Sequence, residues 1–279
     1  MKKNKSTIIL ILVFFVGLSV MLYPTISDYV NQRNQSRAVA SYAQDVDNMT
    51  DADYSAYFDA ADAFNAQVAA NENALYRPDQ LTGYNDTLDI TGTGIMGYIT
   101  ISKIGVELPI RHGTGADVLD DGLGHVHGTS LPVGGKNTRT VISGHTNMEG
   151  RTLFTRLDEL RKGQTFTIGV YGRVLHYRIT GIRITSPKDT DALRIQPGRD
   201  LATLVTCTDT GNSRRLLVTG ERYTPTPSET RETDSKTIRD GALACCGITF
   251  LAGLAVARRG PERLCRHTDD VFRPKEHRS

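Results

Sequence analysis

Two apolar segments, one near each end, set the strongest limit on how this chain can fold. Residues 7–23 contain no charged side chain and are rich in Ile, Leu, Val and Phe, and residues 241–257 form an Ala- and Gly-rich run. Each run has about 17 residues, the short end for a helix that crosses a bilayer. We therefore expect two transmembrane helices that flank one domain on the other side of the membrane.

Basic residues on the outer side of each apolar run indicate the orientation, because Lys and Arg mark the cytoplasmic flanks of spanning helices. They are Lys2, Lys3 and Lys5 before the first run, and Arg258, Arg259, Arg263 and Arg266 after the second. Both termini are then cytoplasmic, and the domain between the helices is extracellular. The alternatives are a cleaved signal peptide, although no small-residue cleavage site follows Tyr23, and a buried second helix.

The composition fits one folded domain with tethers. The chain has 279 residues, of which 39% are hydrophobic and 23% charged, so it is long enough for a real core. Its net charge is only +2, which gives no reason to expect a nucleic-acid partner.

The first half of the predicted outer domain is helical. A polar stretch that runs to about Asn48 is expected to be a mobile or helical stalk. Residues 50–72 then carry apolar side chains at three- and four-residue steps, which predicts an amphipathic helix with Thr50 as its cap. Arg77 and Pro78 end this pattern.

From Gly94 onward the pattern changes to short β-branched or alternating runs bounded by turn residues, which indicates a barrel or sandwich. The expected strands are 95–101, 107–110, 140–143, 165–170, 174–184, 202–207 and 216–223, with short helices at 117–120 and 153–160. The predicted division is an N-terminal anchor (1–24), an extracellular stalk, helix and possible lid (25–93), a β-rich domain (94–223), a linker (224–240), a transmembrane helix (241–257) and a basic cytoplasmic tail (258–279).

Cys207 is the only cysteine between the two apolar runs. Exported cysteines normally pair, so an unpaired one is a candidate reactive thiol. The runs on either side of residues 208–214 read as a hairpin, which would bring Arg215 close to Cys207. His145 follows a strand and a Ser-Gly turn and is a candidate base, although nothing local fixes its position. The plainer interpretation of Cys207 is a small buried apolar residue.

Arg214 and Arg215 cannot easily serve the same site, because adjacent strand residues point to opposite faces. A metal pair at His125 and His127 has no further ligand at convincing spacing, so no metal is expected.

Dispersed motifs in this chain resemble the sortases, and among them the class C, pilus-assembling type. They are Gly97-Tyr98-Ile99, Leu108-Pro109-Ile110, Gly124-His125, residues 128–135, Ser143-Gly144-His145, Leu153-Phe154, Leu157-Asp158, residues 203–208, residues 215–218 and Gly220. The resemblance runs from about Gly94 to Tyr223. Arg214 stands where class C members usually carry a histidine, and Asp209-Thr210 where the family commonly has Pro-Tyr.

The resemblance implies a mainly β fold, a closed eight-stranded barrel, with His145, Cys207 and Arg215 meeting at one end. It further implies a membrane-anchored cysteine transpeptidase that needs no cofactor. Such an enzyme cleaves a Leu-Pro-x-Thr-Gly-type signal between Thr and Gly, and transfers it from a thioester to an amine, here a pilin lysine. Class C members often carry an Asp-Pro-aromatic lid, and this chain has only Tyr76-Arg77-Pro78-Asp79 in that region.

Three alternatives to pilus assembly remain. They are a housekeeping sortase that uses a cell-wall precursor amine, a hydrolytic cysteine protease, and an inactive surface-binding module.

Overall fold

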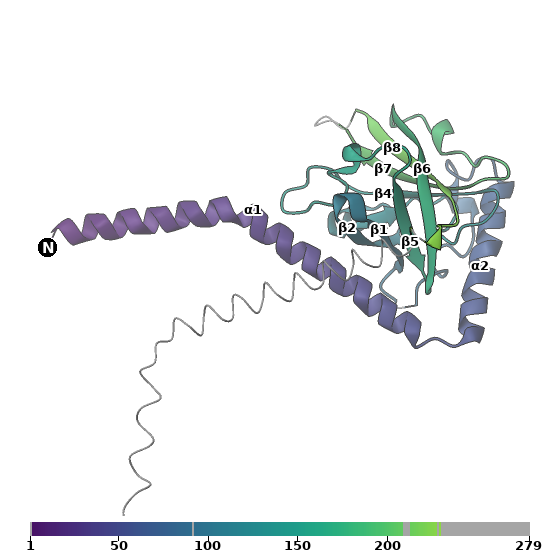
Figure 1. Cartoon of the computed structure of the whole chain (residues 1–279), viewed down its shortest axis with the longest axis horizontal. Helices are drawn as coiled ribbons and strands as arrows, with labels where there is room; N and C mark the ends of the chain where they lie inside the picture. Colours follow the sequence, from purple (N-terminus) through teal and green to yellow (C-terminus); the bar gives the residue numbers. More distant parts are fainter. Residues whose placement is uncertain (1, 91, 209–212, 228, 230–279) are drawn as a thin grey trace, which may run out of the picture. The chain divides into compact units, whose positions relative to one another are not determined.

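The computed structural model describes residues 2–90, 92–208, 213–227 and 229 (Figure 1). The predicted second transmembrane helix, the basic tail and most of the linker lie outside these residues. Of the two expected membrane helices, only the first is therefore described.

The first helix, α1 (Lys2–Asp47), is longer than the predicted anchor. Among the described residues it is the one helix long and apolar enough to be a candidate membrane span. Most of its apolar side chains from Ile8 to Leu22 are exposed, as a lipid-facing surface would be. The helix continues through Pro24 into the polar stretch, so the segment expected as a mobile or helical stalk is an unbroken helix.

The second helix, α2 (Asp51–Ala70), begins as the sequence predicts. The Thr50 hydroxyl accepts a hydrogen bond from the Asp53 N–H, and the Asp53 carboxylate accepts one from the Thr50 N–H, which satisfies two otherwise free donors. The face expected to be apolar is indeed covered, with Phe58, Phe64 and Val68 buried. A short 3-10 turn, η1 (Pro78–Gln80), follows in the segment considered as a lid.

The rest of the domain is a closed eight-stranded barrel in the order β1-β2-β3-β4-β7-β8-β6-β5 (Figure 1). Closure leaves no free strand edge. The strands are β1 (Ile95–Ile101), β2 (Val106–His112), β3 (Leu123–His125), β4 (Thr138–Ser143), β5 (Thr165–Val170), β6 (Arg173–Thr185), β7 (Asp200–Cys207) and β8 (Arg215–Arg222). Short helices α3 (Ala116–Asp121), η2 (Ser102–Ile104), η3 (Leu157–Glu159) and η4 (Asp191–Leu193) interrupt them. The predicted closed barrel is confirmed, although β3 was not among the strands expected from alternation.

Two strand pairs in the barrel are parallel, β2 with β3 and β4 with β7, and the others are antiparallel. Parallel neighbours need a long connection, and the one between β4 and β7 contains β5, β6 and the loop with η4. The carboxyl ends of β4 and β7 therefore lie at the same end of the barrel.

The prediction of a helix over residues 153–160 is wrong, because this segment forms turns instead. The backbone of Leu153 has a φ of 35°, in the left-handed region, and only Leu157–Glu159 makes a 3-10 turn. The predicted apolar face is nonetheless buried, because these turns press Leu153, Phe154, Leu157 and Leu160 into the core.

The second half of α1 packs on the barrel instead of standing clear of it. Val39, Tyr42 and Val46 are buried there. The Tyr42 hydroxyl donates to the Met96 carbonyl oxygen (3.2 Å) and accepts from the Tyr171 N–H (3.0 Å). Burial raises the pKa of Tyr42, so it remains a neutral donor.

Tyr42→Phe should lower the free energy of unfolding by about 1–3 kcal/mol, because the buried Tyr171 N–H loses its acceptor. Urea denaturation measures the difference. Tyr29→Phe makes the same chemical change on an exposed part of the same helix and should leave the midpoint unchanged. Equal midpoints for Tyr42→Phe and the parent chain would mean that α1 does not contribute to the stability of the barrel.

Candidate active site

Cys207 is the last residue of β7 and is a free, partly exposed thiol. Strand β8 lies beside β7, and their register pairs Cys207 with Arg215, the first residue of β8. Directly opposed residues in antiparallel strands project from the same face. The Arg215 side chain therefore starts from the face that carries the Cys207 thiol.

Arg214 lies just before β8 and serves the turn through its backbone. Its carbonyl oxygen accepts from the Thr208 N–H (3.3 Å) and from Nη1 of Arg215 (3.3 Å). The expectation that only one of the two arginines shares the Cys207 face stays a prediction.

His145 comes to the same end of the barrel through the parallel pairing of β4 with β7. Ser143 pairs with Val205, and the Gly144 N–H donates to the Val205 carbonyl oxygen at 3.1 Å. The buried Thr206 hydroxyl then donates to the Gly144 carbonyl oxygen at 2.8 Å. Since the segments that continue β4 and β7 stay in register, His145 and Cys207 both lie two residues beyond the Ser143–Val205 pair.

Gly144 is required by close packing. A Cβ atom at this position would lie 2.4 Å from the Leu123 side chain and 3.0 Å from the Phe154 ring. Any larger residue would push the chain away from the core, and His145 with it. The Phe154 N–H also donates to the His145 carbonyl oxygen (3.1 Å), so the histidine backbone is held on both sides.

Asp120, near the end of α3, is a neighbour of His145 that was not expected from the sequence. Its Oδ1 lies 3.8 Å from Nε2 of His145, and both side chains are substantially exposed. At that distance the interaction is an ion pair only when the ring is protonated, and such exposed pairs contribute about 1 kcal/mol or less. The predicted short helix was the one available signal, and it could not tell which of its acidic residues faces a distant loop.

The polar half of α1 contacts both segments that flank His145. Asp28 accepts from the N–H and the hydroxyl of Thr152, each at 2.9 Å, and Asn31 Nδ2 donates to the Gly150 carbonyl oxygen at 2.7 Å. On the other flank, Gln35 donates to the Asp121 carbonyl oxygen. The helix that contains the candidate membrane span thus anchors the loop after His145 and the end of α3.

The segment considered as a lid lies against the loop between β6 and β7. The Tyr76 hydroxyl is hydrogen-bonded to that of Thr190, while the Asp79 carboxylate pairs with its neighbour Arg77 (3.3 Å). Tyr76 is itself 56% exposed. The segment thus binds a neighbouring loop. A role for it as a lid over Cys207 stays a prediction.

His125 and His127, considered as metal ligands, serve the fold. The His125 ring is fully buried between the Tyr84 hydroxyl (2.9 Å) and the Ser130 carbonyl oxygen (2.9 Å), and burial lowers its pKa to about 3. His127 stacks on Tyr84 with ring centroids 3.9 Å apart. The part of the chain that the structure describes contains no group of three potential metal ligands.

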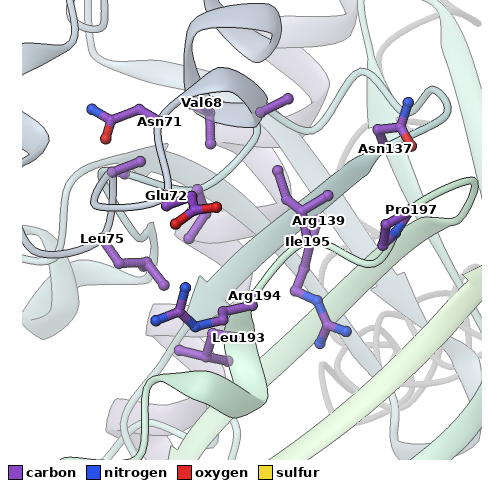
Figure 2. A pocket seen from close by; sticks show the side chains of 14 residues that line it. Val68, Asn71, Glu72, Leu75, Asn137, Arg139, Leu193, Arg194, Ile195 and Pro197 are labelled. Atoms are coloured by element: carbon purple, nitrogen blue, oxygen red, sulfur yellow. The ribbon is translucent and has the colours of Figure 1, made fainter.

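A cavity of about 480 Å³ opens where the end of α2 faces the loop after β3 and the loop between β6 and β7 (Figure 2). Charged side chains from three segments border it: Glu72 after α2, Arg139 on β4 and Arg194 after η4. This cavity was not expected from the sequence, because its walls come from segments far apart in the chain.

Asp28→Ala should loosen the loop after His145, because the Thr152 N–H and hydroxyl lose a charged acceptor. Such hydrogen bonds contribute about 1.5–3 kcal/mol, so amide exchange over residues 147–152 should accelerate about tenfold or more. Hydrogen exchange followed by mass spectrometry measures this rate. Asp47→Ala, with the same charge change at an exposed position, is the control. Unchanged exchange in Asp28→Ala would show that α1 does not hold this loop.

The β-rich domain is similar to known proteins. Residues 99–223 match the sortase domain family. Sortase D of Bacillus subtilis (strain 168) is 33% identical over 132 residues, which are 46% of this chain and 64% of that protein, so the aligned region spans somewhat less than two thirds of this relative.

This chain also aligns with solved structures over their whole length, and two of them serve as examples. Sortase C1 from Streptococcus agalactiae is 36% identical, with a TM-score of 0.62, and the alignment covers 68% of this chain and 100% of that one. Clostridium perfringens sortase C with the C-terminal cell wall sorting motif is 32% identical, with a TM-score of 0.58 and the same coverage of 68% and 100%. The chain therefore belongs to the sortase family, whose members are cysteine transpeptidases, and the solved structures that it resembles are sortases C.

Proposed function

We propose that this protein is a membrane-anchored cysteine transpeptidase with Cys207 as nucleophile, His145 as acid and base, and Arg215 as oxyanion donor. The observation that carries the proposal is the strand register, in which Cys207 is opposite Arg215 and His145 follows the strand paired on the other side of β7. A thiol, an imidazole and a guanidinium are the groups needed for acyl transfer through a thioester.

The proposed substrate is a surface protein with a Leu-Pro-x-Thr-Gly-type signal. Clostridium perfringens sortase C, with the sorting motif in its structure, supports this choice by its likeness. The proposed acceptor is a pilin lysine, because the solved structures that the chain resembles are sortases C. The catalytic domain is proposed to be extracellular, with α1 as its anchor and both termini cytoplasmic; the basic flanks and the apolar surface of α1 support this topology.

The chemistry needs two attacks on one carbonyl. The Cys207 sulfur attacks the Thr carbonyl carbon as a thiolate, and the oxyanion that forms is stabilised by the Arg215 guanidinium. The C–N bond to Gly then breaks, and the Gly nitrogen takes a proton from His145, which leaves a thioester. The acceptor amine attacks the thioester carbonyl and loses a proton to His145, and the Cys207 thiolate departs.

Cys207→Ala should abolish both cleavage of a signal peptide and its transfer to pilin, because no other described side chain replaces the thiol. Chromatography of the peptide with and without pilin measures both products. Cleavage without transfer in the parent chain would identify a hydrolase. Retained transfer in Cys207→Ala would refute the proposed nucleophile.

Arg215→Ala should lower kcat/KM about 10²–10³-fold, which corresponds to a loss of about 2.7–4 kcal/mol of transition-state stabilisation, the scale for one oxyanion donor. Arg214→Ala is the matched control and should lose much less, because Arg214 lies outside the strand register that reaches Cys207. Steady-state kinetics of the two variants gives the ranking. If Arg214→Ala is the more damaging change, the oxyanion donor has been assigned to the wrong arginine.

A further inference from the structure

Arg139, in β4, is a buried cation without a matching anion. Only 3% of the residue is exposed. Its Nη1 donates to the Ala192 carbonyl oxygen (2.9 Å) and to the Thr203 hydroxyl (3.1 Å), while its Nε is buried without a hydrogen-bond partner. Among the described residues, the ion pairs include none with Arg139.

A buried guanidinium normally has a carboxylate beside it, because the loss of hydration is otherwise uncompensated. Here Arg139 borders the cavity of about 480 Å³, so a ligand could supply the missing charge (Figure 2). The other cation of the cavity, Arg194, already pairs with Asp191 at 2.7 Å. Glu72 lies across the cavity in Figure 2 and would repel an anion, so Arg139 is the attractive side.

The cavity borders the start of β4, which pairs with the strand that ends at Cys207. Arg139 pairs with Leu201, six residues before Cys207 on β7. Six extended residues span about 20 Å. The Arg139 guanidinium donates a hydrogen bond to the Thr203 hydroxyl. Thr203, Val205 and Cys207 are alternate residues of β7 and therefore face the same side of the sheet. Of these, Val205 is partly exposed. Leu201 and Thr203 are buried, so the strand spacing gives the distance, and not the path, that a peptide whose Thr is attached to Cys207 covers to reach Arg139.

We propose that this cavity is a substrate subsite, in which Arg139 binds the carboxylate of an Asp or Glu side chain upstream of the sorting signal. An extended chain needs about six residues to cover the distance. Since the leucine of the signal lies three residues before its Thr, the acidic residue falls at least two or three positions before that leucine. This inference rests on the proposed transpeptidase function, and names a substrate feature that the signal itself does not contain.

The experiment compares peptides that differ by one charge. Each contains a Leu-Pro-x-Thr-Gly signal, with Glu or Gln placed in turn at positions two to six before the leucine. Binding to the Cys207→Ala chain is measured by fluorescence anisotropy, and acylation of the parent chain by mass spectrometry. Both are repeated with Arg139→Gln. Thermal unfolding shows whether Arg139→Gln is folded, and Arg139→Lys, which keeps the charge, is a second variant should it not be.

At one or two adjacent positions, the Glu peptide should bind about tenfold more tightly than its Gln counterpart. Arg139→Gln should remove that preference, and Arg139→Lys should keep part of it. A merely structural role of Arg139 would weaken both peptides equally and leave their ratio unchanged.

Equal binding of Glu and Gln peptides at every position would overturn the subsite, and acylation of both would leave the proposed function intact. The subsite would also be wrong if Arg139→Gln kept the preference, or if an acidic peptide without the signal bound as tightly. If no peptide acylates the parent chain but the Glu preference still depends on Arg139, the proposed function fails and the carboxylate site stands.

Discussion

The parallel pairing of β4 with β7 is the constraint on which the candidate site depends. A hairpin alone can bring Arg215 opposite Cys207, but it cannot bring a residue from the middle of the chain to the same place. The register of β4 with β7 continues past the end of β4. Ser143 lies opposite Val205, the Gly144 N–H then donates to the Val205 carbonyl oxygen, and the Thr206 hydroxyl donates to the Gly144 carbonyl oxygen. The position of the His145 backbone follows from these contacts, and its side chain needs no partner in the core.

The polar half of α1 extends this arrangement outward. Asn31 and Gln35 donate to backbone carbonyl oxygens on the two segments beside His145, and Asp28 accepts from Thr152. These contacts tie the loop after β4 and the end of α3 to the helix that contains the candidate membrane span. A domain cut free of α1 would therefore lose contacts close to its candidate active site as well as its tether.

The sequence predicted well what depends on local pattern. The alternation of apolar and polar residues predicted most strands to within one or two residues. The turn residues after Cys207 predicted the hairpin that leads to Arg215, and Thr50 predicted the start of α2. The closed barrel and the roles of the three site residues came from the resemblance to sortases.

What the sequence missed depends on contacts between distant segments. His145 had no local signal for its position, because its strand pairs across a long crossover, and Asp120 was missed for the same reason. The docking of α1 was missed because its Asn and Gln side chains bind specific carbonyl oxygens, whereas such residues normally indicate exposure. Residues 153–160 have helical spacing, but the left-handed backbone at Leu153 replaces the helix with turns.

The central claim is that this strand arrangement makes Cys207 the residue that accepts the acyl group. Mass spectrometry of the acid-quenched parent chain after brief mixing with a signal peptide tests it most directly. The account predicts an adduct whose mass equals the part of the peptide that ends at Thr, located on the fragment with Cys207 and released by hydroxylamine. Product formation with no such adduct, or an adduct on another residue, would contradict it.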